Sequence, residues 1–275
     1  MSEQRVWLIT GATSGFGRAI AQAAVEAGDV VVAAVRRPDA LGELAGRAAA
    51  VRLDVTDLTS IPGVVQEVLA EHGRIDVLVN NAGRGHLGAV EESTDAELRE
   101  LMDLHFFGPA ALTREVLPQM RERGTGCIVQ MSSMGGRTTF PGVGAYSASK
   151  YALEGWSEAL AAEVAPFGVS VVVVEPGAFR TGFNGAGALR TSAALPPYEE
   201  QMAALRDTFA SQDGQQPGDP AKAAAAVLEA VGSDRPPLHL ALGSDAVDAI
   251  AAELDRQRAE LDQWARLSRS TAVEA

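Results

Sequence analysis

A tyrosine, a lysine and a serine are spaced so that they could act together on a carbonyl group. Tyr146 and Lys150 lie four residues apart in a segment with a helical pattern, so both project from one face. An ammonium beside a phenol favours the phenolate and eases loss of the phenolic proton. Ser133, at the end of an expected strand, could hydrogen-bond an oxygen that gains negative charge. The set suits hydride transfer to a carbonyl, although a Tyr–Lys pair by itself is more often an ordinary helix-surface pair.

A glycine-rich segment after the first expected strand has the composition of a phosphate-holding loop. Its glycines follow the pattern G-x-x-x-G-x-G and lead directly into the first expected helix. Glycines there permit a tight turn and let the backbone approach a pyrophosphate, which binds at the helix N-terminus. Such a cluster can be a plain turn, but its place between strand and helix predicts dinucleotide binding. The residues concerned are Gly11, Thr13, Ser14, Gly15, Phe16 and Gly17.

Two arginines, Arg36 and Arg37, follow the second expected strand. An Asp or Glu at this place would accept hydrogen bonds from the ribose 2′-hydroxyl of NAD. A guanidinium instead suits the 2′-phosphate of NADP. The two residues could also be a solvated basic pair in a loop, but the pattern favours NADP over NAD.

Residues after the third and fourth expected strands complete the predicted cofactor site at the carboxyl edge of the sheet. Asp54, followed by Val55, lies where a side chain could reach the adenine, although Asp54 could equally cap a turn. Asn81, Ala82 and Gly83 close the fourth strand, and small residues there would let a cofactor lie across the sheet edge. An asparagine that satisfies loop backbone groups is the alternative interpretation.

The alternation of short apolar runs with helical patterns predicts the architecture that positions these residues. The runs are apolar on both faces, as are the strands of a buried parallel sheet. Repeated strand–helix–strand order implies right-handed crossovers, and hence an α/β, doubly wound sheet in a single domain over residues 1–275. The expected strands are Val6–Thr10, Val30–Val35, Ala50–Leu53, Ile75–Val79, Cys127–Met131, Val169–Val174 and Leu238–Leu242.

The second half of the chain contains an irregular segment and a charged end. Residues 177–219 show no regular pattern, which predicts a mobile lid over a site. An amphipathic helix is expected over about residues 246–267. Its charged part, Glu253–Arg269, indicates a solvated helix rather than a partner motif.

The overall composition limits the partners. The formal net charge of −13 would repel a polyanion such as nucleic acid. A single cysteine, Cys127, excludes an internal disulfide and fits a reducing compartment, and the four histidines lack metal-ligand spacing. No apolar stretch approaches the ~20 residues that cross a bilayer, and no signal-peptide pattern begins the chain. We therefore expect a cytoplasmic protein without nucleic-acid, membrane or metal partners.

Several of these features together resemble the short-chain dehydrogenase/reductase family in its compact single-domain form. The resemblance covers about residues 5–245 and implies a Rossmann-type sheet of seven parallel strands. It implies that Tyr146 is the acid–base residue, that Lys150 orients the nicotinamide ribose and tunes Tyr146, and that Ser133 positions the carbonyl. It also implies that Arg36 marks a preference for NADP and that Thr181 holds the nicotinamide carboxamide. The features that carry it are the glycine loop, Asn80–Gly83, Ser133, Tyr146, Lys150 and Pro176-Gly177…Thr181; Pro176, Gly177, Phe179 and Thr181 would contact the cofactor.

One position departs from the family pattern. Where the family has an asparagine in an Asn-x-x-Gly motif, this chain has His105, three residues before Gly108. In the family a proton relay runs from the lysine through a water near that residue's backbone carbonyl. A histidine could keep this backbone role or join the relay through its ring, and it could equally be a buried packing residue. His105 is therefore a candidate catalytic residue whose role is open.

Apolar residues in three loops indicate the substrate class. Unless they only pack the lid, they predict a small hydrophobic ketone, aldehyde or secondary alcohol. The segments Phe106-Phe107-Gly108-Pro109 and Glu175–Thr181 are similar to those of the hydroxysteroid- and retinol-dehydrogenase-like branch. This similarity supports bulky lipophilic carbonyls without choosing one. In the family, the helices that match Leu98–Arg123 and Ala145–Ala165 pair across a two-fold axis, which implies a homodimer or homotetramer. The apolar loop residues are Leu87, Phe140, Val143, Phe179, Phe183, Leu189, Leu195, Tyr198 and Met202.

The leading hypothesis is an NADP-dependent carbonyl reductase or alcohol dehydrogenase. An isomerase or lyase on the same fold is a second hypothesis, but such proteins usually alter the glycine loop or the Ser–Tyr–Lys set, and both are intact in this sequence. A third is a non-catalytic NADP-binding sensor or scaffold, for which the departure at His105 leaves some room.

Overall fold

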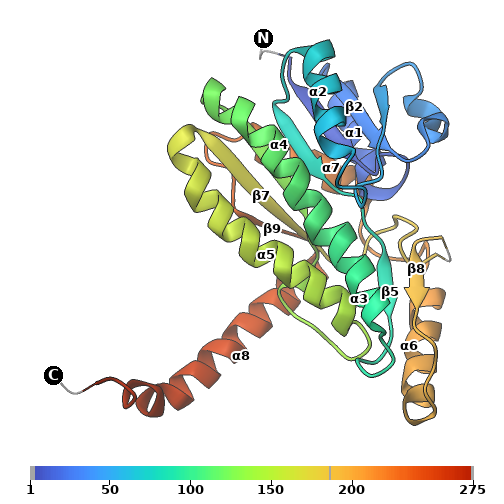
Figure 1. Cartoon of the computed structure of the whole chain (residues 1–275). Helices are drawn as coiled ribbons and strands as arrows, with labels where there is room; N and C mark the ends of the chain where they lie inside the picture. The colour runs from blue at the N-terminus through green and yellow to red at the C-terminus, as the bar shows by residue number, and fades with distance from the viewer. Residues whose placement is uncertain (1–3, 186, 274–275) are drawn as a thin grey trace.

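In the computed structural model, which describes residues 4–185 and 187–273, helices flank a central parallel sheet (Figure 1). The seven strands are ordered β3-β2-β1-β4-β6-β7-β9. The order reverses between β1 and β4, and this reversal opens a crevice at the carboxyl ends of the strands. The predicted doubly wound, seven-stranded, single-domain fold is confirmed. The strands are β1 (Val6–Thr10), β2 (Val30–Val35), β3 (Ala49–Arg52), β4 (Val77–Asn80), β6 (Gly126–Met131), β7 (Val169–Pro176) and β9 (His239–Leu242).

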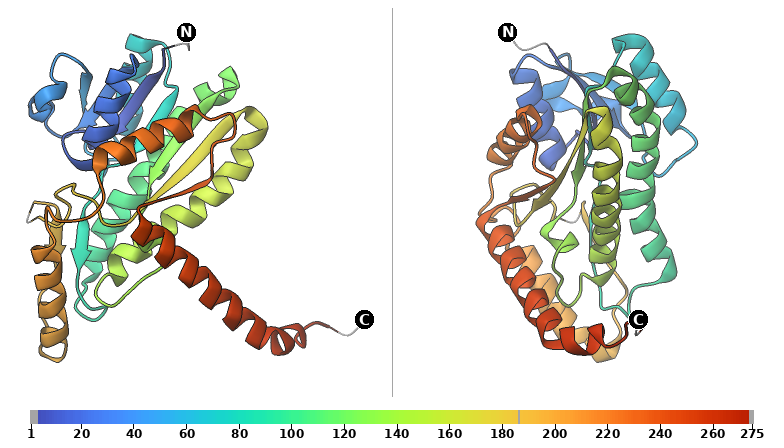
Figure 2. Two further views of the ribbon diagram at one scale, coloured as in Figure 1. Left: turned by 180° about the vertical axis from the view of Figure 1, so that it is seen from behind. Right: turned by 90° about the vertical axis from the view of Figure 1, so that its left-hand side faces the viewer.

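Helices cover both faces of the sheet because successive side chains of each buried strand point to opposite faces. On one face, α1 and α7 pack over a core that includes Trp7 and Ile9. On the other, α2, α4 and α5 pack over a core that includes Leu8 and Ile128. Figure 2 shows the two helical layers from behind and from the side. The helices are α1 (Gly15–Glu26), α2 (Ile61–His72), α4 (Gly108–Arg123), α5 (Gly144–Val164) and α7 (Pro220–Gly232).

The helix expected over residues 98–123 is interrupted in the structure. Helix α3 (Asp95–Met102) begins earlier than expected because Thr94 and Glu97 form a capping box. One π-helical turn, Asp103–Phe107, then separates α3 from α4. Pro109 has no N–H to donate to the carbonyl of residue 105, so the regular α-helical pattern cannot pass through this point. Such turns are rare and frequently mark functional sites.

The segment 177–219, hereafter the lid, contains regular structure that the sequence pattern did not predict. Strand β8 (Leu189–Thr191) pairs in parallel with β5 (Gly85–Leu87) in a second, two-stranded sheet. Helix α6 (Glu199–Ser211) follows, with Met202 as its buried residue. A helix that buries so little carries almost no apolar periodicity, which explains why it was not predicted.

Helix α8 (Ser244–Arg269) confirms the expected terminal helix and begins two residues earlier than predicted. Figures 1 and 2 show it leaving the body and extending away from the sheet. The remaining helical elements are the short 3-10 turns Pro38–Ala40, Gly42–Leu44, Met134–Gly136, Ala165–Phe167 and Pro196–Tyr198.

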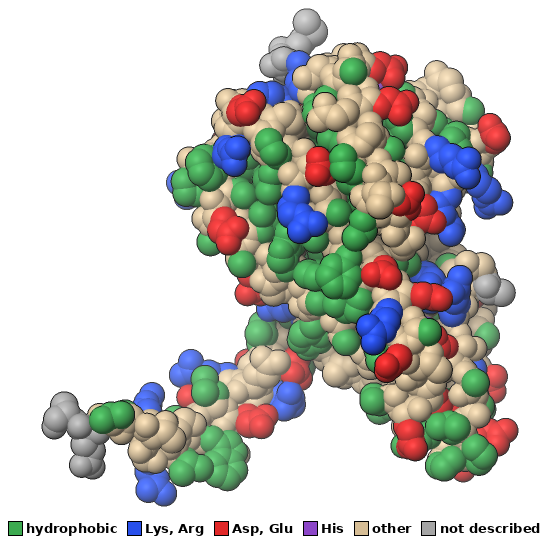
Figure 3. Space-filling model, in the orientation of Figure 1, with side chains coloured by type: hydrophobic (Ala, Val, Ile, Leu, Met, Phe, Trp, Pro, Cys, Tyr) green, Lys and Arg blue, Asp and Glu red, His purple; other side chains and the backbone are tan. Residues whose placement is uncertain are grey.

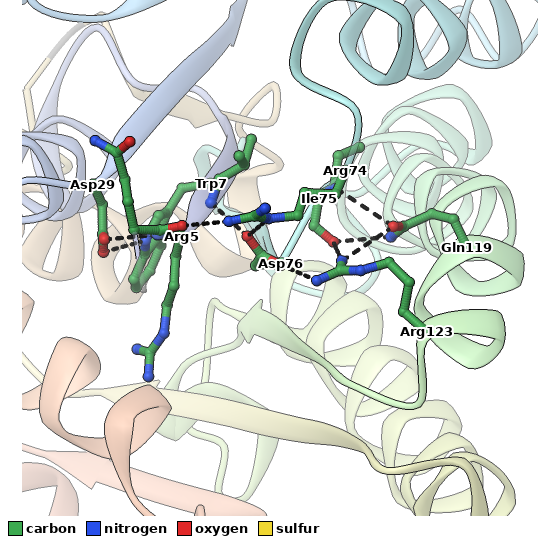
Figure 4. A network of polar contacts seen from close by, with 10 residues as sticks. Arg5, Trp7, Asp29, Arg74, Ile75, Asp76, Gln119 and Arg123 are labelled. Carbon is green, nitrogen blue, oxygen red and sulfur yellow. Dashed lines mark hydrogen bonds and ion pairs between the residues drawn. The ribbon is translucent and has the colours of Figure 1, made fainter. Parts of the chain in front are cut away.

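A polar network joins the amino ends of β1 and β4, at the edge of the sheet opposite the crevice (Figure 4). Asp76 accepts a hydrogen bond from the Val6 N–H at 2.8 Å and pairs with the guanidinium groups of Arg74 and Arg123. Although burial raises the pKa of Asp76, these partners together hold it below its usual value. The network therefore stabilises the amino edge of the sheet, on the side away from the crevice.

Candidate active site

A cleft of about 840 Å³ runs along the carboxyl edge of the sheet, and lid residues form part of its wall. Every predicted site residue except Gly17 lines this cleft. The fold thus brings together segments from six different strand ends, as expected for a doubly wound sheet. The predicted residues that line it are Gly11, Thr13, Ser14, Gly15, Phe16, Arg36, Arg37, Asp54, Val55, Asn81, Ala82, Gly83, His105, Ser133, Tyr146, Lys150, Pro176, Gly177, Phe179 and Thr181.

The glycine loop packs tightly against the end of β4. Gly11 and Gly15 adopt φ angles of 68° and 54°, which favour glycine. A Cβ on Gly17 would lie 2.6 Å from the Gly11 carbonyl oxygen, so Gly17 serves loop packing rather than the cleft surface. Asn81 Nδ2 donates to the Thr10 carbonyl at 2.8 Å, which is the loop-supporting role that the sequence left open. The first turn of α1 contains no acidic residue and therefore suits an anion.

A basic hollow adjoins the cleft near the ends of β2 and β3. Arg36 and Arg37 are exposed and border both the cleft and this hollow. Arg52 borders it as well, because the end of β3 lies beside the end of β2. The sequence did not predict Arg52, since its place beside β2 depends on strand register. Asp54 faces the cleft, but its Oδ1 also accepts from the Thr56 N–H at 3.0 Å, as a turn cap does.

Ser133, Tyr146 and Lys150 converge in the cleft. The Lys150 Nζ atom lies 5.8 Å from the centroid of the Tyr146 ring and donates to the Met131 carbonyl at 2.8 Å. Ser133 Oγ accepts from the Gly135 N–H at 3.0 Å and is placed to hydrogen-bond the phenol. The helix carries the phenol and the ammonium on one face, and the end of β6 brings the serine to them.

Burial governs the ionisation of the two side chains on α5. It raises the pKa of Tyr146 to about 12, and the Ser133 hydroxyl acts in the opposite direction. It lowers the pKa of Lys150 to about 8, against the effect of Glu154. We expected the lysine to lower the pKa of Tyr146, but in this structure burial outweighs any such effect. At neutral pH the phenol therefore holds its proton.

His105 lies in the π turn, fully buried, with both ring nitrogens bonded. Ser149 donates its hydroxyl proton to the Tyr146 carbonyl at 2.7 Å, so it is His105 Nδ1 that donates to Ser149 Oγ, at 2.8 Å. Nε2 accepts from the Arg84 N–H at 3.2 Å. Burial, followed by the charge of Lys150, holds the pKa of His105 well below its usual value. Through these two hydrogen bonds the neutral ring links α5 to the loop after β4, and neither nitrogen is available to transfer a proton.

His105→Ala is expected to lower kcat roughly tenfold by displacing the α5 turn, without moving the pH at which kcat is half-maximal. Ser149→Ala removes the same contact and no titratable group, so it should have the same effect. Profiles of kcat against pH for both variants test this. If the profile of His105→Ala lacked a pKa that the profile of Ser149→Ala retains, the His105 ring would be shown to transfer protons.

A carboxylate that the sequence did not reveal holds the segment Pro176–Thr181. Asp245, at the start of α8, accepts from the Ala178 N–H at 2.7 Å, and the Gly177 N–H donates to the Leu242 carbonyl at 2.9 Å. A side chain on Gly177 would collide with the Asp245 carboxylate. The contact joins residues that are 67 positions apart, a separation that leaves no local sequence signal.

The lid lines the cleft with both apolar and polar side chains, the polar ones including Asn184, Gln212 and Gln216. Phe183 lies 5.9 Å from Tyr146, measured between ring centroids. Of the nine apolar residues predicted for the substrate site, Leu195, Tyr198 and Met202 do not line the cleft: the Tyr198 hydroxyl, for example, donates to Glu91. Phe209 of α6 lines it although it was not predicted. The predicted apolar residues that do line the cleft are Leu87, Phe140, Val143, Phe179, Phe183 and Leu189.

Charged groups join the lid to the helix beside it. Glu100 of α3 pairs with Arg84 at 2.8 Å and with Arg190 of β8 at 2.9 Å. His86 of β5 lies 2.9 Å from the Ser192 hydroxyl, immediately after β8. These contacts close one side of the cleft and place a polar rim beside its apolar wall.

A buried acidic cluster lies one helical turn beyond Lys150. Neither carboxylate oxygen of Glu154 has a hydrogen-bond partner among the described residues, although the nearby Ser132 hydroxyl acts to lower its pKa. His239 Nδ1 lies 3.6 Å from Glu154 Oε2. Glu175 Oε1 accepts from Arg137 at 2.8 Å and lies 2.8 Å from His239 Nδ1. Glu154, Glu175 and His239 offer ligand atoms within 4.8 Å of one another, but the guanidinium already supplies a cation there. Burial raises the pKa of Glu154 to about 8.

Glu154→Gln is expected to stabilise the fold at alkaline pH. The folded state raises the pKa of this carboxyl from 4.5 to about 8, so the stability linked to its proton is complete below pH 4.5 and is lost as pH rises through 8. Glutamine cannot ionise, so the stability of the variant relative to the parent should rise by on the order of 3 kcal/mol between pH 6 and pH 9. Denaturant unfolding at both pH values measures this, with exposed Glu163→Gln as control. Equal gains at the two pH values would contradict it.

A family model described as short chain dehydrogenase matches residues 5–189. The chain belongs to the short-chain dehydrogenase family. Oxidoreductase BOA17 of Botryotinia fuckeliana is 36% identical to it over 273 residues, which cover 98% of this chain and 99% of that protein. The 3-ketodihydrosphingosine reductase of Bacteroides thetaiotaomicron is 39% identical over 244 residues, covering 88% of each. The crystal structure of a short-chain dehydrogenase from Streptomyces avermitilis is 55% identical, with a TM-score of 0.93 over 98% of this chain and 100% of its own.

This short-chain dehydrogenase is an oxidoreductase, and its structural relatives are known with either nicotinamide dinucleotide. A Burkholderia cenocepacia enzyme solved with NADP is 27% identical, with a TM-score of 0.74 over 96% of this chain and 98% of its own. A Burkholderia phymatum enzyme solved with NAD is 26% identical, with a TM-score of 0.81 over 94% of each. The relatives therefore support a nicotinamide cofactor without choosing between the two. Across the described residues, no helix has both the length and the apolar character to cross a bilayer.

Proposed function

We propose that this short-chain dehydrogenase reduces bulky lipophilic ketones or aldehydes with NADPH, and oxidises the corresponding alcohols in reverse. The observation that carries the proposal is the convergence of Ser133, Tyr146 and Lys150 beneath an apolar wall of the cleft. A carbonyl would bind among the three polar groups, with its hydrophobic substituents against the lid.

The residues of the cleft fit a dinucleotide with a 2′-phosphate. The glycine loop lines the cleft at a helix N-terminus without acidic residues, which favours a pyrophosphate. Arg36, Arg37 and Arg52 border the adjoining hollow and outnumber the single carboxylate there, that of Asp39. Guanidinium groups bind phosphate strongly through charge-assisted hydrogen bonds, so we favour NADP over NAD.

The chain's own residues would handle the substrate oxygen, while the bound cofactor supplies the hydride. Ser133 would hydrogen-bond the carbonyl oxygen, and Tyr146 would give its phenolic proton to that oxygen as negative charge develops. The Lys150 ammonium would hold the ribose hydroxyls and stabilise the phenolate that remains. Reduction uses the protonated phenol, and burial, which raises the pKa of Tyr146 to about 12, favours this form.

The substrate class is supported by the apolar residues of the cleft and by the name of one relative. Leu87, Phe183, Leu189 and Phe209 line the substrate end of the cleft, beside the Arg84–Glu100–Arg190 group. The Bacteroides relative is named a 3-ketodihydrosphingosine reductase. A lipid-like ketone with a polar group near the carbonyl would match both parts of this wall.

Turnover of a graded series of ketones with NADPH tests the proposal, followed through the absorbance of the reduced nicotinamide. We expect kcat/KM to rise with the size of the hydrophobic substituent. Equal rates for acetone and for long-chain ketones would rule out the apolar recognition. NADPH binding without turnover on any member would support the sensor hypothesis instead.

We also propose that the enzyme assembles through α4 and α5, as the family resemblance implies. Phe107, Tyr151 and Phe167 are each more than 40% exposed, and Figure 3 shows hydrophobic side chains gathered over these helices. Exposed apolar patches of this kind usually mark contact surfaces. Light scattering should give a mass of at least two chains, and a monomer would refute this part of the proposal.

A further inference from the structure

Helix α8 is almost unsupported by the rest of the chain. Of its 26 residues, Ala246 and Ile250 are the buried ones, both in the first two turns. In Figures 1 and 2 the remainder projects away from the body. Most helical stability in proteins comes from packing an apolar face, and α8 buries residues only in its first two turns.

One side of α8 carries an apolar stripe that nothing in the described chain covers. Val247, Leu254, Leu261, Trp264 and Leu267 are each about half exposed or more. Positions 247, 250, 254, 257, 261 and 264 follow alternating steps of three and four residues, which is the seam of a coiled coil. Five of these six positions are apolar and the other is a glutamine. The charged composition suggested a solvated helix, but this stripe is the pattern of a helix that binds another helix.

The charges on α8 favour a helical partner over a membrane surface. Between positions 251 and 273 the chain has four acidic and four basic residues, so this part has no net charge. Arg256 pairs with Glu253 and Glu260, and Arg258 pairs with Asp262, along the same helix. Helices that bind anionic lipid instead carry an excess of Lys and Arg on the polar face.

We propose that α8 pairs in parallel with the α8 of a second copy of this chain, along Leu254, Gln257, Leu261 and Trp264. Glu253 and Arg258 flank this seam on opposite sides. In a parallel pair, Glu253 faces Arg258 of the partner subunit. An antiparallel pair along the same four residues instead sets Glu260 against Glu260 of the partner subunit and Arg258 against Arg258 of the partner subunit. The charges therefore select the parallel arrangement. The proposal does not depend on the catalytic function.

Two single-cysteine substitutions test the pairing, since the native Cys127 is buried and leaves a clean background. Gln257→Cys and Trp264→Cys each place a thiol on the seam, and each should give a disulfide-linked pair on a non-reducing gel after mild oxidation. Ala259→Cys, on the opposite side of the helix, is the matched control and should remain a single chain. Cross-linking at 257 but not at 264 would refute the parallel register. Equal cross-linking in all three variants would show that the helices do not pair along the proposed seam.

The mass of the intact enzyme supplies an independent measure. Leu261→Asp on the exposed stripe should lower the mass seen by light scattering twofold, while Ala259→Asp should leave it unchanged. NADPH binding should persist in both, which separates this test from any failure of the proposed function. An unchanged mass in Leu261→Asp would overturn the proposal. Flotation of the parent protein, but not of Leu261→Asp, with phosphatidylglycerol vesicles would instead assign the stripe to a lipid surface.

Discussion

Tyr146→Phe is expected to lower kcat for ketone reduction by roughly 10³-fold while leaving NADPH affinity nearly unchanged. The substitution removes the only atoms of this side chain that can give a proton to the developing alkoxide, and it keeps the ring in place. The ring packs against Phe183 and His105, so the cleft should keep its shape. Steady-state rates and fluorescence titration with NADPH measure the two quantities separately.

The neighbouring Tyr151 provides a matched control for this prediction. It lies on the same helix but is 42% exposed and does not line the cleft. Tyr151→Phe should therefore retain the parental kcat. If Tyr146→Phe kept more than a small fraction of the rate, another group would be the proton donor and the mechanism proposed above would be wrong.

The double variant Arg36→Ala/Arg37→Ala is expected to raise KM for NADPH roughly 10- to 100-fold and to leave KM for NADH nearly unchanged. Hydrogen bonds from a guanidinium to a phosphate are charge-assisted, and NADH has no 2′-phosphate with which to form them. Arg52 remains at the same hollow, which limits the loss. Initial rates with each cofactor, at one saturating ketone concentration, give the comparison.

An exposed arginine outside the cleft controls for the general loss of positive charge. Arg47 lies in the loop before β3 and borders neither the cleft nor the basic hollow. Arg47→Ala should leave both KM values as they are. An equal rise in KM for the two cofactors in the double variant would mean that the arginines do not recognise the 2′-phosphate, and the preference for NADP would have to be abandoned.

Local patterns in the sequence were sufficient to predict the strands and the helix that position the site. Apolar runs with turn residues at their ends located all seven strands of the central sheet to within two residues at each end. The four-residue step from Tyr146 to Lys150 predicted a shared face because the period of a helix is a local property. Ser133 joined them because parallel strands present their carboxyl ends at one edge of the sheet.

Other features depend on contacts between distant residues, which leave no periodic signal. The register of β3 against β2 places Arg52 in the basic hollow, and the start of α8 brings Asp245 to Ala178. Three chain segments meet where Glu154 is buried, and this burial rather than its residue type raises its pKa. For Tyr146, too, burial reversed the direction of the pKa shift that the nearby lysine suggested.

The sequence alone therefore determined the sheet, the glycine loop and the identities of the three converging side chains, because strand and helix periods and turn residues act over a few neighbouring positions. Only the tertiary structure decided that both nitrogens of His105 are bonded, that the lid contains a strand and a helix, and that one side of α8 is exposed. These properties arise from packing, which depends on surfaces brought together from separate parts of the chain.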